Sequence, residues 1–300
     1  MARLRAAIET KKSCLVVGLD PDLERLPPET FSQIGQRASG GEGATARASV
    51  AFVMFLEHVI EAVQDSAVAV KPNCAFFERY GAVGWDALRL VCQRAQQAGL
   101  LVILDAKRGD IGHTATAYAD GLLGDLPDTL GPLVDAVTLS PYLGRDSIDP
   151  FLQAVSTAGK GLFILVRTSN ASAGEIQDLE VNSRPLHVHV AERVREWGVD
   201  SEDADGWSPV GAVVGATDAA HGATIRSVLD KRFFLVPGIG AQGGRPEDLR
   251  AFFTSAGEGV IVNASRSILF AYEKRRGPWR DAIRDAAQEI RQELERVRQP

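Results

Sequence analysis

Short apolar runs rich in valine, isoleucine and leucine recur along the whole chain, and longer segments of mixed polarity separate them. Such nearly continuous apolar runs are typical of strands covered on both faces, as in a parallel sheet. The predicted strands span residues 14–19, 68–70, 101–104, 136–139, 162–166, 210–214, 233–236 and 260–262. Because strand and helix patterns alternate eight times, the sequence predicts an α/β fold of the (β/α)8 TIM barrel type.

The segments between these runs carry the spacing of amphipathic helices. Helices are predicted over residues 49–63, 85–98, 146–158, 219–229 and 246–254, and over 278–298, whose apolar positions share one face. The last of these is expected to pack on the outside of the barrel. Periodicity does not show closure, so a doubly wound open sheet is the main rival fold. No GxGxxG motif follows the first strand, which weakens a dinucleotide-binding interpretation.

No composition shift divides the chain, and we expect residues 1–300 to form a single barrel domain. The segment SGGEG at residues 39–43 predicts a flexible insertion near residues 36–46. Residues 177–184 and 200–208 are predicted to be polar surface loops.

Composition narrows the class of protein. The net charge is −6 without a basic tract, so nucleic acid is not an expected partner. No run approaches the roughly 18 apolar residues that a membrane span needs, and the N-terminus lacks the features of a signal peptide. Cys14, Cys74 and Cys92 show no metal-binding spacing and favour a reducing cytoplasm. His187 and His189 are interpreted as solvated, and no metal site is predicted.

Lysine is scarce in this chain, accounting for seven of its 33 cationic residues. Two of the seven, Lys71 and Lys107, end apolar runs. A charged side chain at such a position is unusual and indicates a candidate functional residue. Side chains alternate along a strand, so Asp105 and Lys107 are predicted to project together at the end of the third strand. Asp20 ends the first strand, and Asp110 follows the third in the loop.

These charged groups converge where the strands of a barrel finish, which is the catalytic end of this fold. Each taken alone is also consistent with a helix cap or a simple ion pair. Burying charged groups costs free energy, so a purely structural role does not explain why several of them gather at one end of the barrel. The small residues of 236–244 and 262–267, after the seventh and eighth strands, predict a phosphate site. Its donors would be Gly240, Gln242, Ala264 and Arg266.

The chain resembles the orotidine 5′-phosphate decarboxylase family, most closely a longer bacterial subgroup. The resemblance is carried by DAKRGDI (105–111), a DxKxxDI motif, and by GLDP (18–21), VKPN (70–73), PGIG (237–240) and NASR (263–266). These motifs lie in family order between residues 14 and 270, over essentially the whole predicted barrel.

The resemblance implies a cofactor-free decarboxylation of orotidine 5′-phosphate (OMP) to UMP and CO2 in pyrimidine biosynthesis. It implies a cytoplasmic homodimer whose active sites are shared across the interface. Lys107 would protonate the carbanion at pyrimidine C6, Asp105 would face the departing carboxylate, and Lys71 would hold the charge network and the ribose. Asp20 would bind a ribose hydroxyl, and Asp110 and Thr114 would reach into the partner's site. Ile111, Pro237 and Gly240 would also contact the nucleotide, and Gln242 and Arg266 would bind its 5′-phosphate.

The pyrimidine edge would meet the loop after the fifth strand. Thr168 or Ser169 is the expected contact, and the spacing also admits Asn170 or Ser172. Two alternatives to the decarboxylase remain at this point. One is a related phosphosugar decarboxylase or synthase of the same superfamily, usually magnesium-dependent, and the other is a nucleotide-binding barrel without turnover.

Overall fold

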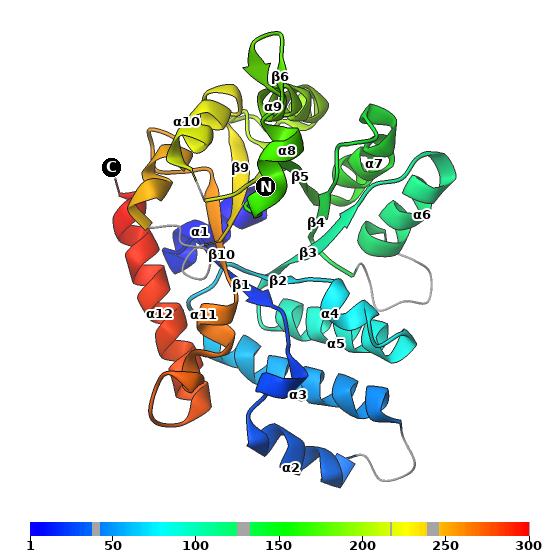
Figure 1. Ribbon diagram of the computed structural model, residues 1–300, viewed down its shortest axis with the longest axis vertical. Helices are drawn as coiled ribbons and strands as arrows, with labels where there is room; N and C mark the ends of the chain where they lie inside the picture. The colour runs from blue at the N-terminus through cyan, green and yellow to red at the C-terminus, as the bar shows by residue number, and fades with distance from the viewer. Residues whose placement is uncertain (38–42, 125–132, 217, 239–245, 300) are drawn as a thin grey trace.

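Eight parallel strands close into a barrel in the computed structural model, which describes residues 1–37, 43–124, 133–216, 218–238 and 246–299 (Figure 1). The strands are β1 Leu15–Leu19, β2 Ala69–Pro72, β3 Leu101–Arg108, β4 Ala136–Leu139, β5 Gly161–Arg167, β8 Ser208–Val214, β9 Arg232–Pro237 and β10 Val260–Ala264. Their order is β1-β10-β9-β8-β5-β4-β3-β2, and β1 returns to pair with β2. The predicted barrel is confirmed, and the open sheet is wrong.

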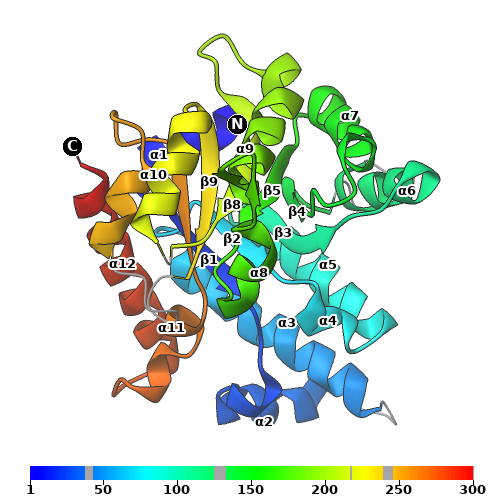
Figure 2. The same ribbon diagram turned by 45° about the horizontal axis from the view of Figure 1, so that its top comes forward.

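Helices surround the barrel, as the two ribbon views show (Figures 1 and 2). They are α1 Ala2–Lys11, α2 Pro28–Arg37, α3 Ala44–Val63, α4 Ala75–Glu78, α5 Ala82–Gln97, α6 Gly112–Leu123, α7 Asp149–Ala158, α8 Gly174–Gln177, α9 Leu186–Gly198, α10 Ala219–Val228, α11 Arg266–Leu269 and α12 Trp279–Arg298. Short 3-10 helices occupy Leu23–Arg25, Arg145–Ser147, Ala171–Ala173, Val199–Ser201, Pro246–Phe252 and Ala271–Glu273.

Several predicted boundaries differ from the structure. The segment predicted as a helix over 246–254 is a 3-10 helix, and α7 begins only at Asp149 because a 3-10 turn precedes it. Helices α2 and α3 extend into the predicted insertion, and residues 38–42 between them lie outside the described residues. The predicted loop 177–184 includes part of a short hairpin, β6 Glu180–Val181 with β7 Arg184–Pro185.

The apolar residues form an outer and an inner layer. Outward-facing strand residues pack against the helices, and the inward-facing ones fill the barrel itself, among them Val16, Ile103 and Phe163. Helix α1 adds Leu4 and Ile8 to the inner cluster, which caps the amino ends of the strands. Side chains therefore fill the barrel interior at the amino end of the strands, and a cavity can form at the carboxyl end.

Helix α12 lies against α3 on the outside of the barrel. Its buried residues, Ala282, Ile283, Ala286, Ala287, Leu294 and Val297, follow the helical period. The ring of Trp279 lies 5.6 Å from that of Phe55 on α3, which anchors the start of the helix. Within the described residues, no helix combines the length and apolarity that crossing a membrane requires.

Candidate active site

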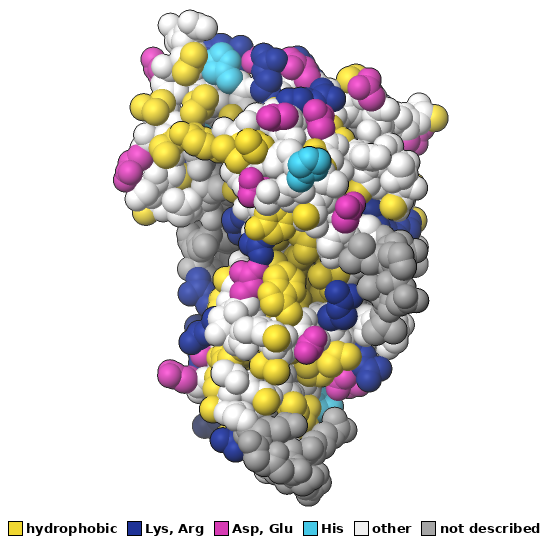
Figure 3. Space-filling model, turned by 90° about the vertical axis from the view of Figure 1, so that its right-hand side faces the viewer, with side chains coloured by type: hydrophobic (Ala, Val, Ile, Leu, Met, Phe, Trp, Pro, Cys, Tyr) yellow, Lys and Arg dark blue, Asp and Glu magenta, His cyan; other side chains and the backbone are white. Residues whose placement is uncertain are grey.

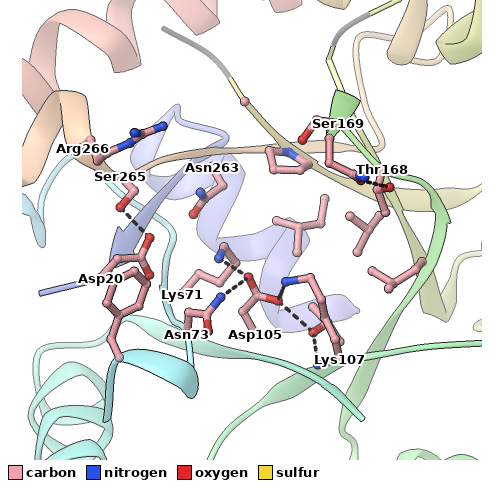
Figure 4. Close-up of a pocket in the computed structure, with 18 of the residues that line it drawn as sticks. Asp20, Lys71, Asn73, Asp105, Lys107, Thr168, Ser169, Asn263, Ser265 and Arg266 are labelled. Carbon is pink, nitrogen blue, oxygen red and sulfur yellow. Dashed lines mark hydrogen bonds and ion pairs between the residues drawn. The ribbon is translucent and has the colours of Figure 1, made fainter. Parts of the chain in front are cut away.

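A cavity of about 700 Å³ opens at the carboxyl ends of the barrel strands. Figure 4 shows most of the residues that line it. Charged groups come from β1 and its following loop (Asp20, Asp22, Arg25), from β2 and β3 (Lys71, Asp105, Lys107) and from the residue after β10 (Arg266). The structure brings Asp20, Lys71, Asp105 and Lys107 together here, as the sequence predicted, whereas Asp110 of the predicted set does not line this cavity. The cavity is large enough for a nucleotide-sized ligand.

Asp105 is the centre of the charged cluster. Its Oδ2 accepts a hydrogen bond of 2.7 Å from Nζ of Lys71, and its Oδ1 accepts one from Nζ of Lys107. Asn73 donates to Oδ2 at 3.3 Å, and the Thr138 hydroxyl donates to Oδ1 at 3.1 Å. Four neighbours thus fix one carboxylate, and each oxygen carries one ammonium group.

The charges of this cluster stabilise one another. Burial alone would raise the pKa of Asp105, but the charges of Lys71 and Lys107 outweigh it and hold that pKa well below its usual range. Burial would lower the pKa of Lys71, yet the carboxylates of Asp105 and Asp20 raise it. Asp105 and Lys71 therefore stay ionised throughout the physiological pH range.

The two lysines differ in exposure. The side chain of Lys71 is 6% exposed, whereas that of Lys107 is 46% exposed and faces the cavity. Lys107 also has a φ of 47°, a left-handed conformation that costs free energy for a residue with a side chain. Its backbone N–H donates to the Thr138 hydroxyl at 2.9 Å, which supports this conformation. Regular strand alternation therefore predicted that Lys107 and Asp105 lie together, but it did not predict the left-handed backbone conformation at Lys107.

Asp20 and Arg266 lie across the cavity from Lys107 (Figure 4). Ser265 donates to Asp20 Oδ2 at 2.7 Å, whereas the buried Asp20 Oδ1 has no hydrogen-bond partner among the residues that the structure describes. Arg266 makes no ion pair within the part of the chain that the structure describes. An unpaired guanidinium at the first position of α11 suits an anionic group of a ligand.

Residues after β5 form another wall of the cavity. Thr168, Ser169 and Asn170 line it, and Ser172 does not. The side chain of Gln177 also lines the cavity, accepting at 2.8 Å from the Thr168 N–H and donating at 2.8 Å to the Thr168 hydroxyl. Gln177 therefore fixes the orientation of Thr168.

An ion pair behind this wall holds the β5 loop in place. Arg167 makes two hydrogen bonds of 2.9 Å to the carboxylate of Asp178. His187 lies 3.2 Å from Asp178 and bonds to the Gln177 carbonyl at 3.0 Å. His187 is 1% exposed, so the sequence interpretation of a solvated histidine was wrong, and its burial lowers its pKa.

Asp178, His187 and His221 place potential metal ligands within 4.8 Å of one another. Sequence spacing did not indicate this grouping, because loop and helix packing create it. Arg167 already neutralises Asp178 with two hydrogen bonds, so a second cation there would be repelled. We assign the cluster to support of the β5 loop.

The remaining predicted residues divide into three groups. Pro237 lines the cavity at the end of β9. Asp110, Ile111 and Thr114 do not line the cavity of their own chain, and Ile111 is 54% exposed. Gly240 and Gln242 lie outside the described residues.

Sequence reasoning missed Asn73, Thr138, Gln177, Asn263 and Ser265 as cavity residues. Asn73 could have been found, because it lies two residues beyond Lys71 in the VKPN segment. Asn263 likewise shares a face with the interior residue Ile261 at the end of β10. The local sequence does not identify Gln177, because its contact with Thr168 arises only from the way residues 168–177 fold.

Comparison with known proteins gives a consistent picture. The family model described as "Orotidine 5'-phosphate decarboxylase / HUMPS family" matches residues 15–277. A protein of Rhodopirellula baltica named orotidine 5'-phosphate decarboxylase is 42% identical over 300 residues, covering 97% of each chain. A protein of the same name from Caldicellulosiruptor bescii is 40% identical over 276 residues, covering 90% of this chain and 89% of the other.

A solved structure of Leishmania donovani OMP decarboxylase is 35% identical, with a TM-score of 0.76, and the match covers 99% of this chain and 98% of that one. Family model, relatives and fold agree over nearly the whole length. The chain belongs to the orotidine 5′-phosphate decarboxylase family.

Proposed function

We propose that this protein decarboxylates OMP to UMP and CO2 without a metal or organic cofactor, and that Lys107 supplies the proton. The observation that carries the proposal is one carboxylate, Asp105, held between two lysines in a nucleotide-sized cavity. The relatives named above carry the name of this enzyme.

The reaction breaks the bond between pyrimidine C6 and the carboxylate carbon. The bonding electrons stay on C6, neutral CO2 leaves, and C6 then takes a proton from the Lys107 ammonium group. Solvent reprotonates the lysine. The carbanion at C6 has little resonance relief, so a fixed cation beside it lowers the barrier. Lys107 supplies both the cation and the proton.

Asp105 faces the substrate carboxylate in this proposal. Two like charges repel in the bound substrate, and the repulsion disappears as CO2 forms. Binding energy from the distant phosphate offsets the repulsion. Arg266 provides that contact at the opposite side of the cavity (Figure 4).

The direct test is turnover by chelator-treated protein. Purified protein incubated with EDTA is expected to convert OMP to UMP at an unchanged rate, followed as loss of OMP absorbance. A matched sample with added magnesium serves as the control. Turnover that stops with EDTA and returns with magnesium would favour a metal-dependent relative, and UMP binding without turnover would favour a silent nucleotide-binding barrel.

We further propose that the active enzyme is a homodimer that acts in the cytoplasm. Asp110, Ile111 and Thr114 are partly or fully exposed and lie outside their own cavity, which suits residues that complete a partner's site. Hydrophobic side chains gather on the face of the molecule that includes α6 (Figure 3). Exposed apolar residues of this region include Ile111, Tyr118, Tyr142 and Leu143. Three buried free thiols fit a reducing compartment.

Mixed dimers test the shared site. Lys107→Ala and Asp110→Ala homodimers are each expected to be nearly inactive. Mixing them after unfolding and refolding should restore one complete site in each mixed dimer, because one subunit supplies Lys107 and the other Asp110. Activity is measured after separation by two different affinity tags. A mixed dimer no more active than either parent would refute the shared site.

Arg266→Ala tests the phosphate contact. Losing a charge-assisted pair is expected to weaken UMP binding by about 10- to 100-fold and uridine binding by less than about 2-fold. Calorimetric titration with both ligands measures the difference. Arg193→Ala, which removes a 58% exposed arginine side chain elsewhere, is the control. Equal losses for the nucleotide and the nucleoside would remove Arg266 from the phosphate site.

A further inference from the structure

Strand β3 loses its regular pairing at the residues that carry the charged cluster. Leu104 pairs with Val137 and Arg108 with Leu139, so β3 advances four residues while β4 advances two. The irregular segment, residues 105–107, is here called the β3 bulge, and Lys107 within it has a φ of 47°. A bulge re-aims a side chain, and unfavourable backbone conformations persist only where neighbouring groups hold them. The position of the Lys107 ammonium group therefore depends on what holds the β3 bulge.

The side chain of Arg108 spans this bulge. Its Nη1 donates at 3.2 Å to the carbonyl of Ala106, the residue on the other side of Lys107. Its Nη2 donates to Oε1 of Glu78 on α4, and its guanidinium lies 5.5 Å from the centre of the Tyr118 ring on α6. One rigid planar group thus connects both neighbours of Lys107 with the two adjacent helices.

The Arg108–Glu78 ion pair lies outside the cavity. The two side chains are 23% and 33% exposed, and neither is among the described residues that line the cavity. Any effect of this pair on a bound ligand must therefore pass through the backbone of Lys107. Loss of Glu78 would leave the guanidinium half-buried and unpaired, free to leave the Ala106 carbonyl.

We infer that Arg108 and Glu78 are positioning residues for the reaction: together they hold the β3 bulge that directs the Lys107 ammonium group to Asp105 and the cavity. The inference rests on the proposed function. Because a displacement of about 1 Å at a reacting group can cost about 100-fold in rate, a clamp outside the cavity can control turnover.

The experiment separates turnover from ligand binding. Glu78→Ala and Arg108→Met are each expected to lower kcat for OMP by about 10- to 100-fold, while the Kd of UMP changes by less than about 3-fold. Glu78→Gln, which keeps an acceptor oxygen for Arg108, should recover most of the kcat. Glu57→Ala is the matched control, because it breaks an ion pair with Arg94 between α3 and α5 and should keep full activity.

Two double variants test whether the pair acts as one unit through Lys107. Glu78→Ala combined with Arg108→Met should be no slower than the slower single variant, because losing either partner already opens the clamp. In a Lys107→Ala background, Arg108→Met should lower the residual single-turnover rate by less than about 2-fold, because no ammonium group remains to be positioned.

Stability and molar mass distinguish positioning from a structural role. Both single variants remove partly exposed side chains, so each should keep a Tm within about 5 °C of the wild type. Light scattering should give each variant the molar mass of the wild type.

Three results would overturn the inference. They are an unchanged kcat in both single variants, a fall in kcat matched by an equal fall in UMP affinity, and a fall in kcat accompanied by a lower molar mass. The last would assign the pair to a contact between subunits. Absence of OMP turnover by the wild type would instead refute the proposed function.

Discussion

Lys107→Ala is expected to reduce kcat for OMP decarboxylation by a factor of about 10⁴ or more, because the variant loses both the cation beside the C6 carbanion and the proton donor. The ammonium group of Lys107 bonds to Asp105 and borders the cavity, so no other described group occupies its position. The variant also leaves Asp105 with a single ammonium partner, Lys71, which adds to the loss.

The Lys107 variant should still fold and bind the product. The Lys107 side chain is 46% exposed, so its removal creates little buried cavity, and UMP affinity should change by less than about 10-fold. Lys231→Ala, at the amino end of β9, removes an exposed lysine far from the cavity and should keep full activity. Stopped-flow single turnovers and UMP titration measure the two quantities. A Lys107→Ala protein with a tenth or more of the wild-type kcat would contradict the assignment.

Arg226→Met is expected to destabilise the fold by about 3–5 kcal/mol, the largest stability effect predicted for a single side chain. Arg226 is 8% exposed and donates to five backbone carbonyls, at distances of 2.7–2.8 Å. The acceptors belong to Leu229, Asp230, Arg232, Phe252 and Gly259. Methionine fills similar space but leaves all five carbonyls without this partner.

This arginine joins α10 to the amino ends of β9 and β10, opposite the cavity. Burial lowers its pKa to about 9, so the guanidinium remains charged at neutral pH, where it also lies 3.6 Å from the centre of the Phe234 ring. Folded Arg226→Met should therefore keep its kcat at low temperature while its urea midpoint falls. Arg193→Met, on exposed surface, should stay within about 0.5 kcal/mol. A normal urea midpoint for Arg226→Met would show that water replaces the arginine without cost.

The strands were predictable because each contains a short buried apolar run. In β3, the apolar run Leu101–Leu104 is followed by Asp105 and Lys107. Because side chains alternate along a strand, these two charged residues lie on the same face, and the strand direction places them at the carboxyl end of the barrel. Helix α6 was missed because its buried stripe begins with two small residues, Ala115 and Ala119, which give a weak apolar signal. Helix α9 was missed because its two histidines suggested a solvated segment.

Tertiary packing decides what local sequence leaves open. The contact of Gln177 with Thr168 joins residues nine positions apart, across a 3-10 helix and α8. The turn at Lys107 depends on a hydroxyl from the neighbouring strand. The structure places Thr168, Ser169 and Asn170 along the cavity and Ser172 away from it. Sequence periodicity does not predict which residues line the cavity, because that depends on how the chain folds back on itself.

Proton transfer at C6 can be observed directly and in isolation from the loss of CO2. By microscopic reversibility, the group that protonates the carbanion also removes the C6 proton from bound product, and fluorine at C5 makes that proton more acidic. Wild-type protein in D2O is expected to place deuterium at C6 of 5-fluoro-UMP, seen by NMR, and Lys107→Ala saturated with the same ligand should not. Equal exchange by both proteins, or none by the wild type, would contradict the role assigned to Lys107.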